Sequence, residues 1–334
     1  MKSKWHPSAT RLVVILVLAC CLGACSHHIR SFIKTYQEQL NNADILFSTE
    51  EEELGLYRIG SHEINKVQAD SWHRFSYSSG TSSLLYHSYQ PDFAVGLVTR
   101  KGSELVGYGF DRCDMTSFLD EGGSIAYITY KTLLEGGTKF EGDLVIAKFT
   151  ETKSNEALII LSINDKEANN IDKCFLGTNI EYDGKLYYQD MLPDGEHALN
   201  ELDLNTYEIT TIFTTDLIMA PAISPNGERI AFTKKDGIYV YEFQTGQIEK
   251  IVDIQWAAQF TGWNTYNFYF SKYVPIASWS PDGKQIVYNI SQQIPYSVNN
   301  EAVPDESDIY IYDFTTKQET KIISGGYSPY WVLD

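Results

Sequence analysis

The chain has 334 residues, of which 43% are hydrophobic and 13% aromatic, with 23 tyrosines and 16 phenylalanines. It carries 44 acidic and 26 basic side chains, which give a formal charge of −18. Such a charge repels nucleic-acid phosphates and anionic lipid headgroups, so we expect no binding to nucleic acid and no basic membrane patch.

The N-terminal 24 residues have the pattern of a secretory signal peptide. Basic residues at Lys2, Lys4 and Arg11 precede an apolar run from Leu12 to Leu22. This run is shorter than the roughly 20 residues that a membrane-spanning helix needs. An uncleaved anchor helix is the alternative reading.

Residues Leu22-Gly23-Ala24-Cys25 resemble the lipobox of bacterial lipoproteins. The resemblance implies cleavage before Cys25, attachment of palmitate-type acyl chains there, and an extracytoplasmic protein anchored in a membrane. Ser26 implies the outer membrane in a Gram-negative host, and a Gram-positive host implies the outer face of the cell membrane. Cys20, after Val17-Leu18-Ala19, is a competing site with a shorter apolar run before it.

Residues 25–43 form the expected lipidated tether. Apolar side chains recur there at helical spacing, at Ile29, Phe32, Ile33, Tyr36 and Leu40. We expect this partly helical segment to dock on its own domain, with recruitment of a partner helix as the alternative. The glutamates that follow at 50–53 could bind a cation, but such a run is usually solvated.

Residues 44–334 read as a single all-β domain of short strands separated by turns. From the N-terminus, the expected strands are Ile45–Ser48, Leu54–Ile59, Glu63–Val67, Trp72–Ser78, Ser83–Tyr89, Ala94–Thr99, Glu104–Phe110, Ser124–Tyr130, Asp143–Phe149, Ala157–Ile163, Lys185–Gln189, Ala198–Leu204 and Tyr207–Phe213. Ser328–Leu333 reads as a first strand with nothing after it, and the sheet at the N-terminus lacks a first strand. Together they predict a ring closed by the C-terminal strand, which removes exposed sheet edges.

The clearest repeat lies in the last third of the chain. Ile223-Ser224-Pro225-Asn226-Gly227 precedes the expected strands Arg229–Phe232 and Ile238–Phe243. Trp279-Ser280-Pro281-Asp282-Gly283 likewise precedes Gln285–Tyr288 and Ile309–Phe314. Proline and glycine fit the second and fourth positions of a tight turn, and self-similarity on this scale indicates repeated units that stack on one another.

This pair resembles the propeller repeat of TolB and of the prolyl oligopeptidase family, with the tryptophan-serine-proline-aspartate-glycine turn complete at Trp279–Gly283. The resemblance implies a six-bladed β-propeller with four-stranded antiparallel blades. It does not identify a chemistry, because such propellers serve as binding scaffolds, enzyme lids and lyases. Because the sequence ends at Asp334, we expect no hydrolase domain like that of the peptidases.

Only Cys113 and Cys174 remain after Cys25. Each stands before the expected first strand of consecutive blades, so a disulfide and two separate thiols are equally compatible with the sequence. Four histidines beyond the tether, His62, His73, His87 and His197, are scattered over the expected blades. No catalytic, metal or cofactor motif is evident, so no cofactor is expected.

The most suggestive binding feature is the aromatic connection from Asp253 to Pro275. Its side chains include Trp256, Trp263, Tyr266 and Tyr269. In a propeller it would meet two other long loops, Thr132–Gly142 and Ser291–Ser307, on one face. Aromatic rings anchor many recognition surfaces, but the same rings could pack as a lid over the channel. We expect a binding or scaffold module for a protein or carbohydrate partner, with a lyase or glycan-processing enzyme as the alternative.

Overall fold

The computed structural model describes residues 40, 42–51, 53–67, 72–78, 83–88, 94–101, 104–110, 113–119, 124–132, 140–148, 158–162, 178, 180–192, 194–254, 274–291 and 307–332. Between 72 and 162 it describes the backbone pairing of the strands, with the side chains of Tyr77, Leu84 and Leu119. Among these residues no helix is long and apolar enough to cross a membrane.

The described strands form six four-stranded antiparallel sheets. Sheet 1 contains β24 (Gly326–Trp331), β1 (Ile45–Thr49), β2 (Leu54–Arg58) and β3 (Glu63–Val67), and sheet 2 contains β4 (Trp72–Ser78), β5 (Ser83–Ser88), β6 (Ala94–Lys101) and β7 (Glu104–Phe110). Sheet 3 contains β8 (Cys113–Leu119), β9 (Ser124–Thr132), β10 (Phe140–Lys148) and β11 (Leu158–Ser162), and sheet 4 contains β12 (Glu181–Tyr182), β13 (Lys185–Met191), β14 (His197–Asp203) and β15 (Ile209–Thr215). Sheet 5 contains β16 (Met219–Ile223), β17 (Arg229–Lys234), β18 (Gly237–Glu242) and β19 (Gln247–Asp253), and sheet 6 contains β20 (Ser278–Trp279), β21 (Gln285–Ser291), β22 (Ser307–Asp313) and β23 (Gln318–Ser324).

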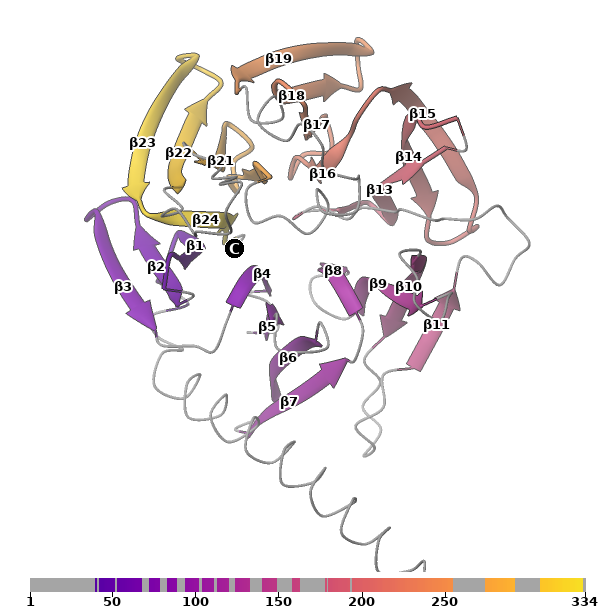
Figure 1. Cartoon of the computed structure of the whole chain (residues 1–334), viewed down its shortest axis with the longest axis horizontal. Helices are drawn as coiled ribbons and strands as arrows, with labels where there is room; N and C mark the ends of the chain where they lie inside the picture. The colour runs from indigo at the N-terminus through magenta and orange to yellow at the C-terminus, as the bar shows by residue number, and fades with distance from the viewer. Residues whose placement is uncertain are drawn as a thin grey trace, which may run out of the picture.

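Figure 1 shows these sheets around a common centre, with β3, β7, β15, β19 and β23 at the periphery. Sheets 2 to 6 each use four consecutive strands, whereas sheet 1 joins strands from the two ends of the chain. The yellow C-terminal strand β24 lies beside the indigo β1 and pairs with it through Ile45–Trp331 and Leu46–Tyr330. The predicted pairing of the terminal strands is therefore present.

Further contacts hold β24 in place. The Val332 amide donates to the Asp44 carbonyl over 2.9 Å, and the Trp331 amide donates to Ser278 Oγ of sheet 6 over 2.9 Å. The Tyr330 hydroxyl donates to the Tyr77 carbonyl of sheet 2 over 3.1 Å. The last strand thus contacts the sheets on both sides of its own.

The strand predictions agree closely with the structure, apart from some strand ends. Trp72–Ser78, Glu104–Phe110 and Glu63–Val67 have the expected bounds. The prediction of a long loop over Thr132–Gly142 was wrong, because Phe140 pairs with Thr132 and the connection shortens to 133–139. The last strand begins at Gly326, two residues before the expected start.

Hydrogen bonds explain the repeated serine-proline turn. The Ser224 hydroxyl donates to Asn226 Oδ1 over 2.7 Å and accepts from the Arg229 amide over 3.0 Å. The Ser280 hydroxyl donates to Asp282 Oδ1 over 2.8 Å and accepts from the Gln285 amide over 2.9 Å. A short polar side chain that bonds nearby backbone in this way stabilises a turn.

A second repeat joins the third and fourth strands of sheets 4, 5 and 6. One residue of each turn has a positive φ. It is Tyr207 in sheet 4 (60°), Gly246 in sheet 5 (69°) and Lys317 in sheet 6 (55°). The residue two positions before it is Asn205 in sheet 4, Gln244 in sheet 5 and Thr315 in sheet 6. A β-bulge follows in each outer strand, at Ile212, Ile251 and Ile322. Sheet 4, whose sequence repeat is degenerate, therefore has the same construction as the two clear copies.

The core lies between neighbouring sheets. Tyr187 and Leu199 of sheet 4 pack with Ile230 and Phe232 of sheet 5. Val287 and Ile309 of sheet 6 pack with Ile45, Phe47 and Trp331 of sheet 1. Sheet 5 buries one face against sheet 4 and the other in a cluster shared with sheet 6, so it could not fold alone.

Candidate functional site

Side-chain contacts to the backbone place several strand ends on one face of the molecule. The Thr233 hydroxyl, near the end of β17, donates to the Pro275 carbonyl over 2.6 Å. The Ile276 amide, just before β20, donates to Asn289 Oδ1 near the end of β21 over 3.2 Å. We call this side the loop face, since the chain leaves sheets 5 and 6 there.

The aromatic connection begins and ends on the loop face. Ile254, with 6% of its surface exposed, follows the outer strand β19, and the fully buried Val274 precedes β20. Trp256, Trp263, Tyr266 and Tyr269 lie outside the described residues. Their role in binding stays a prediction. The residues at the two ends of this connection, Ile254 and Val274, are both buried.

A second long connection leaves the same face. Ser291 ends β21, Ser307 begins β22, and their side chains are buried with Oγ atoms 3.4 Å apart. The segment 292–306 lies outside the described residues. Two of the three predicted loops therefore start and end on one face of sheets 5 and 6, and the third, in sheet 3, is shorter than predicted.

Three equivalent positions beneath this face carry buried polar side chains: Gln189, Thr233 and Asn289. Each lies on the second strand of its sheet, two residues after a core residue on the same face, which is Tyr187, Ala231 or Val287. Thr233 and Asn289 hold the backbone that enters β20. Among the described residues Asn289 Nδ2 is buried without a hydrogen-bond partner.

These polar positions were not predicted from the sequence. The signal was present, because the alternation of β21 places Asn289 on the same face as Val287, which packs in the core with sheet 1. A buried polar group normally finds a partner, but Asn289 Nδ2 has none among the described residues. Its burial leaves no direct access from solvent among the described residues.

Ion pairs neutralise several lysines near the loop face. Lys234 lies 2.8 Å from Asp216, Lys250 lies 2.5 Å from Asp236, and Lys321 lies 2.6 Å from Asp308. Hydrogen bonding from Lys250 holds the pKa of Asp236 below its usual value. Each of these three basic charges is therefore paired with a carboxylate.

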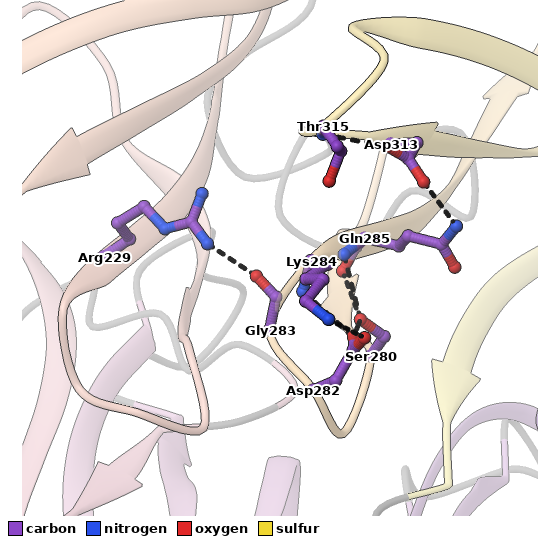
Figure 2. Close-up of polar contacts among 8 residues, drawn as sticks. All are labelled: Arg229, Ser280, Asp282, Gly283, Lys284, Gln285, Asp313 and Thr315. Atoms are coloured by element: carbon purple, nitrogen blue, oxygen red, sulfur yellow. Dashed lines mark hydrogen bonds and ion pairs between the residues drawn. The ribbon is translucent and has the colours of Figure 1, made fainter.

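The opposite face carries the serine-proline turns and a contact between sheets 5 and 6 (Figure 2). Arg229 donates from Nη2 to the Gly283 carbonyl over 2.5 Å. Its guanidinium carbon lies 4.9 Å from the Trp279 ring centre and 4.4 Å from that of Phe314. Partial burial lowers the pKa of Arg229 without discharging it. This arrangement joins two sheets and offers no open site.

The remaining predicted site residues are not brought together. Cys25 and Cys174 lie outside the described residues, and Cys113 is the first residue of β8 rather than preceding it. His62 Nδ1 bonds the Tyr57 hydroxyl over 2.9 Å, whereas His197 is buried on sheet 4. The described part of the chain contains no group of three or more histidine, cysteine, aspartate or glutamate side chains that could hold a metal ion.

Comparisons with known proteins agree with this architecture. The family model for the dipeptidyl peptidase IV N-terminal region matches residues 181–293, the part with the clearest repeats. No curated protein sequence matches the chain.

Two solved structures are similar to it across most of its length. TolB from Acinetobacter baumannii has a TM-score of 0.60 at 11% identity, covering 87% of this chain and 66% of that one. A protein assigned as TolB from Agrobacterium tumefaciens has a TM-score of 0.53 at 13% identity, covering 84% of this chain and 91% of that one. This chain therefore spans just under two thirds of the Acinetobacter protein. Its four-stranded antiparallel sheets, its serine-proline repeats and these neighbours together identify a TolB-like β-propeller.

Proposed function

We propose that this protein is a lipid-anchored, extracytoplasmic scaffold whose six sheets close into a six-bladed propeller, and that its loop face binds a protein or glycan partner. The likeness to TolB structures supports a propeller, and the partner is inferred from this chain's own residues.

One observation carries the assignment to the loop face. Ile254, Val274, Ser291 and Ser307 are all buried and lie at the same ends of sheets 5 and 6. The two segments that they bound therefore begin and end on the same face, and one of them contains eight aromatic residues between 256 and 273. Rigid sheets that present adjacent long loops are a common basis for recognition.

The opposite face is a poorer candidate. Its turns are short and closed by their own hydrogen bonds, as at Ser224 and Ser280. Arg229, the prominent cation there, is already occupied by Gly283, Trp279 and Phe314. The serine hydroxyls of these turns are therefore engaged within the turns themselves.

Photocrosslinking tests the proposal even where the partner has not been identified. A photoreactive amino acid replaces Trp263 in one protein and Lys284, on the turn face, in another. Lys284 is a matched control because its side chain is 68% exposed. We expect discrete adducts in intact cells from position 263 and none from position 284. Adducts of equal yield from both positions, or from 284 alone, would refute binding at the loop face.

Anchoring rests on the lipobox resemblance and has its own test. Replacing Cys25 by serine should remove the lipid mass from the mature protein and release it from membranes. Intact-mass measurement of the wild-type protein should show acylation at Cys25. An unmodified wild-type Cys25 would remove the anchor from the proposal while leaving the loop-face assignment in place.

A further inference from the structure

The outer strands of sheets 4, 5 and 6 are equivalent in construction but differ in charge. Each strand has an isoleucine at its bulge, so β15, β19 and β23 can be aligned residue by residue. The three residues before the bulge include Glu249 and Lys250 in β19, and Glu319 and Lys321 in β23. In β15 they are Ile209, Thr210 and Thr211, and the whole strand ITTIFTT is uncharged.

Charged side chains are a known protection of exposed sheet edges against pairing with another strand. In β19 the lysine forms an ion pair with Asp236, just before β18, and in β23 it forms one with Asp308 of β22. The equivalent Thr211 instead donates to Asn200 Oδ1 of its own sheet over 2.9 Å. The β15 edge therefore lacks the protection that its two counterparts have.

Backbone geometry indicates which groups this edge offers. The Asp203 amide donates to the Glu208 carbonyl over 3.0 Å, so that pair is hydrogen-bonded. Pairs alternate in an antiparallel ladder, which puts Ile209 and Thr211 in the pairs that are not hydrogen-bonded. Their N–H and C=O groups point away from β14. Among the described residues no strand pairs with this side of β15.

The Ile209 side chain strengthens the case. It is 44% exposed, as is Ile248 at the equivalent position of β19, but Ile248 is followed by Glu249 and Lys250 whereas Ile209 is followed by two threonines. The β15 edge thus has four outward-pointing backbone groups and an exposed isoleucine. Proteins that bind a peptide by strand addition use such an edge, with backbone hydrogen bonds giving affinity and side chains giving specificity. The bulge at Ile212 limits the pairing to a short stretch.

We propose that the β15 edge binds an extended segment of a protein partner, with uncharged β-branched residues at its centre and lysine or arginine at its ends. The acidic charge of the chain, −18, and Glu208 beside the start of β15 favour basic flanks. Antiparallel pairing of a second copy over this short stretch would place Glu208 opposite Ile212 of that copy, so a second copy brings no basic group to Glu208. This site is separate from the loop face and goes beyond the proposed function.

A synthetic peptide of alternating valine and threonine with lysine at both ends is the probe, and fluorescence anisotropy measures its binding to the full chain. We expect Thr211→Lys, which restores the protection seen in β19 and β23, to weaken binding at least tenfold. Thr320→Lys on the already charged β23 is the matched control and should leave the affinity unchanged. N-methylation of alternate peptide amides should abolish binding, because backbone hydrogen bonds carry it.

Failure of the wild-type protein to bind the peptide, or equal binding by Thr211→Lys, would overturn the proposal. Equal binding of the N-methylated peptide would also overturn it, since contact would then be through side chains. Thermal melting of both variants checks that they fold. Sedimentation provides the last outcome: a wild-type dimer that Thr211→Lys disperses would show that a second copy, and not a basic segment, occupies the edge.

Discussion

The two serine-proline turns have the same hydrogen bonds, although a glutamate follows in one and a lysine in the other. In sheet 5 Asn226 donates from Nδ2 to Glu228 over 2.7 Å, whereas in sheet 6 Asp282 lies 3.5 Å from the Lys284 ammonium. In both turns the Oδ1 atom accepts the serine hydroxyl proton and a backbone amide. The Oδ1 acceptor is therefore what the two turns share. The neutral Asn226 stands two residues before the acidic Glu228, and the acidic Asp282 stands two residues before the basic Lys284.

Asp282 should make the stability of this turn depend on pH. Hydrogen bonds from the Lys284 amide and the Ser280 hydroxyl lower the pKa of Asp282. A lowered pKa contributes stability above the unfolded-state value of about 4 and loses it as pH falls through the folded-state value. Asp282→Asn keeps the acceptor oxygen, as Asn226 does, but cannot titrate.

Urea unfolding between pH 7 and pH 3 checks this prediction. The free energy of unfolding of the wild-type protein should fall more steeply below pH 4 than that of Asp282→Asn. Parallel pH profiles for the two proteins would show that the carboxylate contributes nothing through its charge.

The glycines of the two turns should differ in their tolerance of alanine. Both have positive φ, +69° at Gly227 and +65° at Gly283. A Cβ at Gly227 would overlap the ring of Tyr182, whereas at Gly283 the nearest atom, Pro225 Cδ, is 3.8 Å away. Gly283→Ala should cost about 1 kcal/mol from backbone strain alone, and Gly227→Ala roughly 1 kcal/mol more from the overlap.

Equilibrium denaturation measures the two costs. Adding Tyr182→Ala to each glycine variant should remove the difference between them, because the ring that causes it is gone. Equal costs in the single variants would contradict the packing of Tyr182 on the neighbouring turn.

At the scale of elements, the contact between sheets 5 and 6 depends on Arg229. Arg229→Ala should cost about 2 kcal/mol, because it removes a bond to the Gly283 carbonyl and two aromatic contacts. Arg229→Lys should recover only part of this loss, since an ammonium cannot stack flat on a ring. Lys284→Ala, an exposed control nearby, should change the free energy of unfolding by less than about 0.5 kcal/mol. An equal effect of Arg229→Ala and Lys284→Ala would refute the role assigned to Arg229.

Alternation and turn residues were enough to predict most of the strands. They worked because a strand has a period of two and because glycine and proline mark the turns. They failed at Phe140–Gly142, which were predicted as part of a loop but continue the ladder with β9. They also gave no sign of the two-residue strand β12, which is too short to show a period.

The candidate site was less predictable than the fold. The aromatic connection is visible in the sequence, but contacts such as Thr233 with Pro275 join residues 42 positions apart. The polar positions Gln189, Thr233 and Asn289 are equivalent only once the three sheets are aligned in space. The unprotected edge of β15 likewise emerges only from comparison with its two counterparts.

At the scale of the whole molecule, both ends of the described chain meet in sheet 1. The strands β24 and β1 come from opposite ends, and β24 also bonds sheets 2 and 6 through Tyr330 and Trp331. If the six sheets form one closed ring, every sheet depends on this junction. The loop face then keeps its shape because the ring cannot open.

Deleting residues 328–334 tests this closed ring most directly, with thermal unfolding and amide hydrogen exchange as the measurements. We predict a melting temperature lower by roughly 10 °C or more, together with loss of exchange protection in β1 and in strands of sheets 2 and 6. A chain ending at Val332 keeps every described contact of β24 and should melt like the wild-type protein. An unchanged melting temperature after the deletion of 328–334, with protection of β1 retained, would contradict closure of the ring by the C-terminal strand.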